Sequence, residues 1–189
     1  KLRMALGVTP IVSAIFANSG LSEGKANGYV SRRLHIWQHT DPDRSGLLPI
    51  AFEDGFGYRD YVEWALDVPM FFVVRDGRYA AANGMTFRSF MTEGRDGERA
   101  TLDDWARHLT TLFPEVRLKH VIEVRGADAV PPGLTCSLPA IWKARWYAAK
   151  VRKTRATQPS DATGGSSGCS PSFTPASSAA GSTALIKYV

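Results

Sequence analysis

The chain has 189 residues, of which 44% are hydrophobic and 11% aromatic, and this composition favours a globular domain over a disordered chain. Its net charge of +5 comes from the C-terminal part, because residues 143–189 hold 7 basic residues against 1 acidic residue. Residues 1–142 therefore hold 16 basic and 17 acidic residues, a balance of −1. The basic charge thus gives no ground for a nucleic-acid partner of the folded part.

Membrane and secreted proteins are also disfavoured as classes. No apolar run reaches the roughly 18 residues that a membrane span needs, and the longest run, residues 4–17, is broken by Pro10. Cys136 and Cys169 form neither a CxxC pair nor a disulfide framework, so we expect a cytoplasmic protein. Because the sequence begins at Lys1 and not at Met, we also expect it to be part of a larger protein.

The N-terminal half predicts helices joined by loops. Residues 3–17 predict an apolar helix kinked at its proline, and the Gly-, Ser- and Asn-rich residues 18–29 predict a long loop. Residues 31–46 predict a short amphipathic segment that ends in an Asp-Pro-Asp turn. Residues 58–68 have the apolar spacing of a helix.

The next segments carry clearer local signals. Two apolar runs within residues 69–81 flank Asp76-Gly77, a pair that favours the type I′ turn of a β-hairpin. Residues 101–113 predict a helix with Thr101 as its N-cap and Asp104 completing a capping box.

The C-terminal part changes character along its length. Residues 134–150 predict a last helix, and the small and polar residues of 156–184 predict disorder. We therefore expect a folded domain over residues 1–150 and a low-complexity, disordered tail over residues 151–189.

Charged and apolar residues alternate along residues 113–128. One set of alternate positions is almost entirely charged, and the other is almost entirely apolar; the first set is Glu115, Arg117, Lys119, Val121, Glu123 and Arg125. Since side chains alternate in direction along a strand, the pattern predicts one strand with a charged face and an apolar face. The charged face belongs either to a solvated surface strand or to a polar site.

Within this strand, Glu123 and Arg125 are the residues that could carry chemistry. A carboxylate is a hard oxygen ligand suited to Mg²⁺, and a guanidinium group binds phosphate or carboxylate through two hydrogen bonds. An ordinary ladder of ion pairs is the alternative. The chain lacks phosphate-loop, dinucleotide-binding and HExxH motifs, and His35 and His39, four residues apart, are expected to be ordinary polar positions and not metal ligands.

Several blocks together resemble a known family. They are "RMALGVTPIVSAIFANS", "EGKANGYVSRRLHIWQHTDPDRSGLLP", "YVEWALDVPMFFV", "GMTFRSFM" and "TLFPEVRLKHVIEVRGAD". From about residue 2 to about residue 142, the chain resembles glutamate–cysteine ligase of the plant and proteobacterial type. The resemblance implies an α+β fold with a partial antiparallel sheet funnel, glutamine-synthetase-like, and helices packed outside it. The charged face of the strand would then line the funnel.

The resemblance also implies a reaction. ATP would phosphorylate the γ-carboxylate of glutamate, and the amine of cysteine would attack the acyl phosphate to give γ-glutamylcysteine, with Mg²⁺ and arginines neutralising charge. Glu123 would be a Mg²⁺ ligand and Arg125 a clamp for the phosphate of ATP or of the acyl phosphate. Arg117 would be a second clamp.

Further site residues follow from the same resemblance. Arg33 would hold a substrate carboxylate, and Trp37 would wall the pocket, although plain core packing also explains this tryptophan. Phe71 stands where plant enzymes have a tyrosine on the cysteine side of the site. Asn18 either contributes from its loop or ends the first helix. Cys136 matches a cysteine of a redox-sensitive disulfide whose partner lies outside this sequence, so here it is expected to pack as a small hydrophobic residue.

We expect small-molecule substrates, neither nucleic acid nor a membrane as partner, and draw no expectation about the oligomeric state. The sequence after about Trp142 departs from the family, and the isolated chain is expected to have little or no ligase activity. Two alternatives stay open. One is another carboxylate–amine ligase of the same fold, and the other is a non-catalytic binding fragment that uses the basic run of Lys150, Arg152, Lys153 and Arg155.

Overall fold

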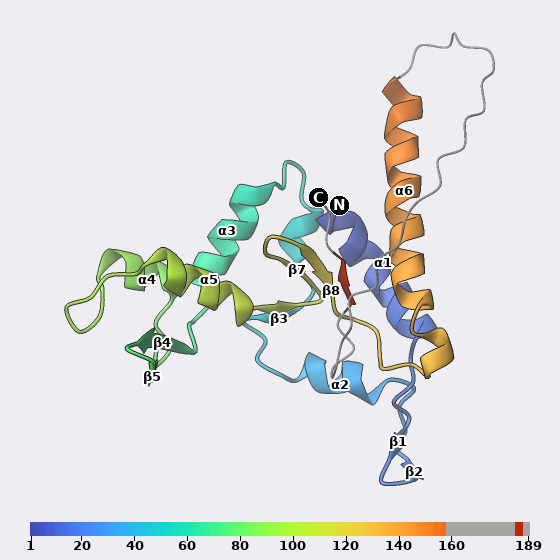
Figure 1. Ribbon diagram of the computed structural model, residues 1–189, viewed down its shortest axis with the longest axis horizontal. Helices are drawn as coiled ribbons and strands as arrows, with labels where there is room; N and C mark the ends of the chain where they lie inside the picture. The colour runs from blue at the N-terminus through green and yellow to red at the C-terminus, as the bar shows by residue number, and fades with distance from the viewer. Residues whose placement is uncertain (158–183, 187–189) are drawn as a thin grey trace. The chain divides into compact units, whose positions relative to one another are not determined.

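The computed structural model describes residues 1–157 and 184–186 (Figure 1). The described chain divides into two compact units, one made of residues 1–130 and the short strand 184–186, and the other beginning at Pro131. The helices are α1 (Leu2–Ile15), α2 (Arg32–Gln38), α3 (Tyr58–Asp67), α4 (Phe87–Thr92), α5 (Leu102–Thr110) and α6 (Ser137–Thr157), with 3-10 helices η1 (Pro49–Phe52) and η2 (Pro132–Leu134). Among these, no helix has the length and apolarity that crossing a membrane requires.

The strands are short and form separate small sheets. They are β1 (Leu21–Ser22), β2 (Lys25–Ala26), β3 (Ser45–Gly46), β4 (Phe72–Arg75), β5 (Arg78–Ala81), β6 (Phe113–Pro114), β7 (Val116–Leu118), β8 (Ile122–Val124) and β9 (Ala184–Ile186). The pairs β1–β2 and β4–β5 and the sheet β7–β8–β9 are antiparallel, whereas β3 and β6 pair in parallel. The mixture of helices and small sheets confirms the α+β class.

The apolar core of the first unit lies among α3, α4, α5 and the β4–β5 hairpin, which Figure 1 shows gathered together. Phe87 and Phe90 of α4 pack with Val73 of β4, and Trp105 of α5 contacts both this cluster and the one around Leu112. The hairpin turns at Asp76 and Gly77, both with positive φ, as the sequence predicts.

The start of α5 also confirms its prediction. The hydroxyl of Thr101 accepts a hydrogen bond from the backbone N–H of Asp104 (3.1 Å), and the Asp104 carboxylate accepts one from the backbone N–H of Thr101 (2.9 Å). The same carboxylate accepts two hydrogen bonds from Arg75 of β4, at 2.6 and 2.9 Å. The buried carboxylate of Asp104 therefore caps the N-terminus of α5 and links this helix to the β4–β5 hairpin.

Residues 113–128 do not form the single strand that the alternation predicts. The chain reverses at 119–121, where the N–H of Lys119 donates to the carbonyl of Val121 (3.0 Å), and β7 pairs with β8. This reversal lets Val116 lie opposite Val124, so that both valines are buried on the side packed against α1. The single-strand expectation was wrong because pairing within the segment satisfies the backbone and buries the apolar side.

The alternation of faces nevertheless survives the turn. Arg117 lies opposite Glu123, and Leu118 lies opposite Ile122, so odd-numbered residues face odd-numbered residues across the hairpin. Side chains directly opposite each other in an antiparallel pair project from the same face of the sheet. The charged residues of both strands therefore share one side, as the sequence analysis expected for a single strand.

The second unit begins with η2 and continues into α6, which runs beyond the expected end at residue 150 to Thr157. Ala, Lys and Arg favour helix, which accounts for the extension. Cys136 lies in the turn before α6 and is exposed, so its expected packing as a small hydrophobic residue was wrong. The side chains of the basic run, and nearly all of the segment expected to be disordered, lie outside the described residues.

Gly126 offers a test of how closely α1 packs on the hairpin. A Cβ atom at this position would lie 2.5 Å from Oγ of Ser13 and 2.7 Å from Cγ2 of Thr9, both on α1. We predict that Gly126→Ala lowers the free energy of unfolding by about 1–3 kcal/mol through overpacking. Urea unfolding of the wild type and of Gly126→Ala measures this difference. Gly133→Ala is the control, because a Cβ at Gly133 would have no atom within 4 Å. Equal unfolding midpoints would contradict this packing.

Candidate functional site

The charged face of the hairpin centres on a buried ion pair between Arg117 and Glu123. Nε of Arg117 donates to Oε2 of Glu123 (3.0 Å), and Nη2 donates to Oε1 (2.9 Å) and Oε2 (2.7 Å). Nη1 donates to the carbonyls of Thr110 (2.7 Å) and Leu112 (2.9 Å). An arginine has five N–H donors, and those of Arg117 all have acceptors within the protein. Arg117 thus has no N–H left for a ligand.

Arg125 is held differently. Its Nη1 donates to Oε1 of Glu123 (3.2 Å), and its guanidinium carbon lies 5.3 Å from the ring centre of Trp37 and 5.1 Å from that of Phe113. Within the described residues, Nε and Nη2 of Arg125 make no hydrogen bond. Burial, followed by the charge of Arg117, lowers the pKa of Arg125. An anion next to these N–H groups would offset the loss of solvation.

Glu123 is surrounded by cations. Its exposed fraction is 1%, and besides the two arginines it has Nζ of Lys119 at 3.6 Å from Oε2. Burial by itself would raise the pKa of Glu123, but hydrogen bonds from Arg117 and the charges of Arg117, Arg125 and Lys119 lower it below its ordinary value. The carboxylate is therefore ionised near neutral pH.

This donor set does not fit a Mg²⁺ ion at Glu123. Both carboxylate oxygens already accept hydrogen bonds from guanidinium groups, and three cationic side chains would repel a metal ion. In the part of the chain that the structure describes, no group of three or more His, Cys, Asp or Glu residues could hold a metal. The predicted metal role of Glu123 is thus not supported by its geometry.

Helix α2 places Arg33 and Trp37 next to Arg125. Arg33 donates from Nη2 to the carbonyl of Arg125 (2.5 Å) and from Nη1 to that of Gly126 (3.2 Å). The ring of Trp37 lies 5.7 Å from that of Phe113. The two residues that the resemblance places in a substrate pocket therefore lie next to Arg125, on a helix distant in sequence.

Phe71 and Phe113 extend the aromatic surface. Their ring centres are 6.4 Å apart, and the guanidinium of Arg44 lies 3.5 Å from the ring centre of Phe71. Arg44 is buried and donates to Asp41 (2.5 Å) and to the carbonyl of Pro69 (2.7 Å). Sequence reasoning missed Phe113, although it lies one period before Glu115 on the same alternation. No local signal pointed to Arg44.

A buried carboxylate fixes the beginning of α2. Asp128 is 2% exposed and accepts hydrogen bonds from the backbone N–H of Asn18 (2.7 Å) and from the hydroxyls of Ser19 (2.7 Å) and Ser31 (2.8 Å). Ser31 is also the N-cap of α2, and Ser19 accepts the backbone N–H of Arg33 (3.0 Å). Asn18 therefore holds the loop to Asp128 and does not end α1, whose C-cap is Phe16.

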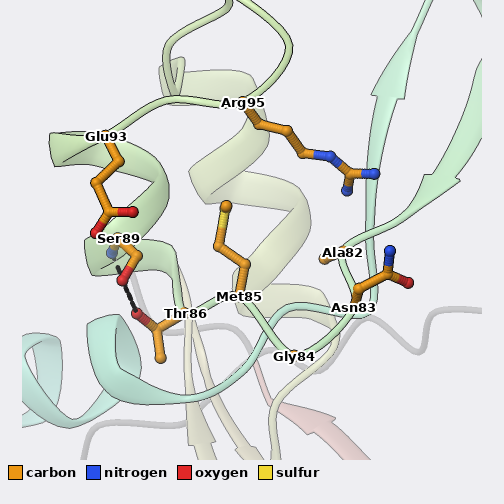
Figure 2. A pocket seen from close by; sticks show the side chains of 8 residues that line it. All are labelled: Ala82, Asn83, Gly84, Met85, Thr86, Ser89, Glu93 and Arg95. Carbon is orange, nitrogen blue, oxygen red and sulfur yellow. Dashed lines mark hydrogen bonds between the residues drawn. The ribbon is translucent and has the colours of Figure 1, made fainter.

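Two surface depressions lie elsewhere. One of about 480 Å³ is lined by residues of 82–95, and Figure 2 shows the side chain of Arg95 extending toward Ala82 and Asn83. The other, of about 430 Å³, is lined by residues of 17–30. The second is lined by Asn18, but neither is lined by Arg125, Glu123 or the other predicted site residues Arg117, Arg33, Trp37 and Phe71. The convergence of Arg125, Arg33 and the aromatic rings is thus the stronger indication of a site than these hollows.

Glu115 is the other carboxylate beside the cluster. Its Oε2 lies 3.0 Å from where a Cβ on Gly126 would be, and within the described residues its carboxylate makes no hydrogen bond or ion pair. Burial raises the pKa of Glu115 above its ordinary 4.5, although the charges of Arg33 and Arg125 act in the opposite direction. Its stabilising contribution is therefore complete below pH 4.5 and is lost as the pH rises through the folded-state pKa.

We predict that Glu115→Gln is more stable than the wild type at pH 7, because the unfolded state no longer gains from losing the proton. The difference in unfolding free energy should shrink toward zero as the pH falls to 4.5. Urea unfolding at several pH values measures it, with the exposed Glu53→Gln as the control. A Glu115→Gln variant less stable at pH 7 would show that Glu115 is ionised and favourably paired.

The sequence of the chain is similar to those of known proteins. A family model described as glutamate-cysteine ligase family 2 matches residues 1–166. Glutamate–cysteine ligase B from Oryza sativa subsp. japonica, a chloroplastic protein, is 53% identical over 150 residues, which are 78% of this chain and 30% of that protein. The chloroplastic ligases of Brassica juncea and Arabidopsis thaliana are 52% and 50% identical over 151 residues, which are 78% of this chain and 29% of each protein.

The chain spans less than a third of the length of these curated relatives, so the matched region is one part of a larger ligase in each of them. Within that region the match covers α1 to β8, and with them the residues around Arg125. The family model and the relatives agree with each other and with the resemblance seen in the sequence blocks. By its sequence, the chain belongs to glutamate–cysteine ligase family 2.

Proposed function

We propose that this chain supplies an arginine-lined part of the site of an ATP-dependent glutamate–cysteine ligase. In that reaction the γ-carboxylate of glutamate is phosphorylated by ATP, and the amine of cysteine displaces phosphate from the acyl phosphate to form γ-glutamylcysteine. This is the first step of glutathione biosynthesis. The hairpin β7–β8 would form one wall of an antiparallel, glutamine-synthetase-like funnel, with α1 packed outside it.

One observation carries the proposal: the guanidinium group of Arg125, two of whose nitrogens make no hydrogen bond within the described residues, lies next to the rings of Trp37 and Phe113 and beside Arg33. A guanidinium group in such a half-buried place binds an oxyanion more strongly than it would in water. A transferring phosphoryl group and two amino-acid carboxylates are the anions of this reaction. Arg125 and Arg33 have the chemistry to bind them.

The proposed roles follow from these contacts. Arg125 would bind the transferring phosphoryl group and stabilise the charge that develops on it. Arg33 donates two N–H groups to backbone carbonyls, and its three others, which make no hydrogen bond within the described residues, would bind a substrate carboxylate. Trp37 and Phe71 would border the site, the latter on the side of cysteine. Mg²⁺, which ATP-dependent ligation implies, is not assigned to a described residue.

Three further points stay predictions. Another carboxylate–amine ligase of the same fold is the alternative enzyme, and a screen of amine acceptors separates the two. The alternative of a basic-tailed binding fragment depends on side chains outside the described residues. A cytoplasmic setting is likewise a prediction, whereas the relatives compared above are named chloroplastic.

A chimera tests the proposal directly. We predict that rice ligase B whose matching 150 residues are replaced by those of this chain forms γ-glutamylcysteine from ATP, glutamate and cysteine. In the chimera, Arg125→Ala should lower kcat/KM by about 10²–10³, the usual loss for one stabilising donor. The control is Arg88→Ala, because Arg88 pairs with Glu63 and Asp67 on the surface. A folded chimera that makes no γ-glutamylcysteine would contradict the proposal.

A further inference from the structure

The arginines of the charged face differ in what they can offer a ligand. Arg117 spends its five N–H groups on Glu123 and on the carbonyls of Thr110 and Leu112. Arg125 spends one N–H group on Glu123. The carboxylate of Glu123 accepts hydrogen bonds from both guanidinium groups. Within the described residues, no other carboxylate contacts both of them.

We propose that Glu123 is a positioning residue, paired with Arg117, that aims the guanidinium group of Arg125 at a phosphoryl or carboxylate oxyanion. The inference rests on the proposed function and deepens it by assigning the roles within the charged face. Arg125 alone is the anion-binding arginine of this face. Glu123 does not ligate Mg²⁺, and Arg117 does not touch the substrate.

The charges favour this assignment. Arg117 and Glu123 neutralise each other in a buried, bidentate contact, and Arg125 leaves the group of three with a net positive charge. An anion is therefore attracted, and a divalent cation is repelled. A Mg²⁺ ion at Glu123 would also have to displace donors at 2.7 to 3.2 Å from both oxygens.

The geometry favours it as well. Arg125 is held by the Glu123 carboxylate and by the rings of Trp37 and Phe113, and its side chain is 13% exposed. A donor that is fixed before the ligand arrives loses little conformational freedom on binding. Lys119, 3.6 Å from Glu123 and more exposed, lies at the turn and lacks such aromatic contacts in the described residues.

The two roles of Glu123 predict opposite signs for one measurement. If Glu123 were only a negative charge near the site, Glu123→Gln would leave the affinity for a metal-free anion unchanged or increase it, because a repulsive charge is removed. If Glu123 positions Arg125, the same change weakens anion binding, because the guanidinium group loses its orientation.

The experiment uses the full 189-residue chain labelled with ¹⁵N-arginine, whose Nε–H signals are followed by NMR. Loss of a signal in Arg117→Lys and in Arg125→Lys assigns the two resonances. Inorganic phosphate and, separately, acetate are titrated at constant ionic strength without Mg²⁺. The Nε–H signal of Arg125 should shift on titration in the wild type, whereas that of Arg117 should shift little.

In Glu123→Gln we expect the phosphate affinity to fall about tenfold and the Arg125 signal to move to the position of exposed arginines. The matched control is Asp104→Asn, because Asp104 is a buried carboxylate that accepts two hydrogen bonds from Arg75 outside the cluster. This control should change thermal stability and leave phosphate affinity as it was. Whichever of phosphate and acetate binds with the higher affinity identifies the class of anion that Arg125 binds.

A second variant covers the case in which Glu123→Gln does not fold. Arg117→Met combined with Glu123→Leu removes both members of the buried pair, so that neither Arg117 nor Glu123 is left as a lone buried charge, and cores tolerate such a replacement. Arg125 and Lys119 lose the Glu123 carboxylate, as they do in Glu123→Gln. It should fold, keep Arg125, and bind phosphate about tenfold more weakly. Unchanged or tighter phosphate binding in a folded variant would overturn the proposal, as would a wild-type chain in which phosphate does not shift Arg125.

The outcome is separable from that of the proposed function. A chimera without ligase activity, together with a phosphate response that depends on Glu123, would reject the reaction and keep the positioning role. An active chimera whose kcat/KM does not change in Glu123→Gln would support the reaction and reject the positioning role of Glu123.

Discussion

The buried contact between Arg117 and Glu123 is the interaction on which the charged side of the hairpin depends. Glu123 is almost fully removed from water, so its charge is tolerated only because hydrogen bonds and cations surround it. Arg117 in turn binds the carbonyl of Thr110, the last residue of α5, and that of Leu112 just after the helix. The position of Arg125 thus follows from the packing of a helix that contains none of the site residues.

The second support of the site comes from the loop before α2. Asp128 accepts hydrogen bonds from two serine hydroxyls and a backbone N–H, and these contacts fix the residue at which α2 begins. Because α2 carries Arg33 and Trp37, the aromatic and basic sides of the site depend on a carboxylate that makes no ion pair within the described residues. Three hydrogen bonds from the chain stabilise this buried carboxylate.

Much of the site could be predicted from the sequence, because the alternation of charged and apolar residues and the helix caps are patterns of neighbouring residues. The alternation at 115–125 placed Arg117, Glu123 and Arg125 on one side even though the chain turns back, and the caps of α5 followed from Thr101 and Asp104. The contacts that decide roles could not be predicted, because they join distant segments. Phe113, Arg44 and Asp128 act through partners many residues away, and the saturation of Glu123 is visible only in three dimensions.

The turn at 119–121 has a consequence for how this region can vary. Within the turn, His120 is exposed and can change, whereas Val121 is buried and Nζ of Lys119 lies 3.6 Å from Oε2 of Glu123. Adding or removing one residue would shift the register and place a valine, instead of Glu123, on the side of the arginines. Substitution at His120 is therefore cheap, and an insertion or deletion in the turn is not. Among relatives of this chain, we expect position 120 to vary in residue type and the loop between β7 and β8 to be constant in length.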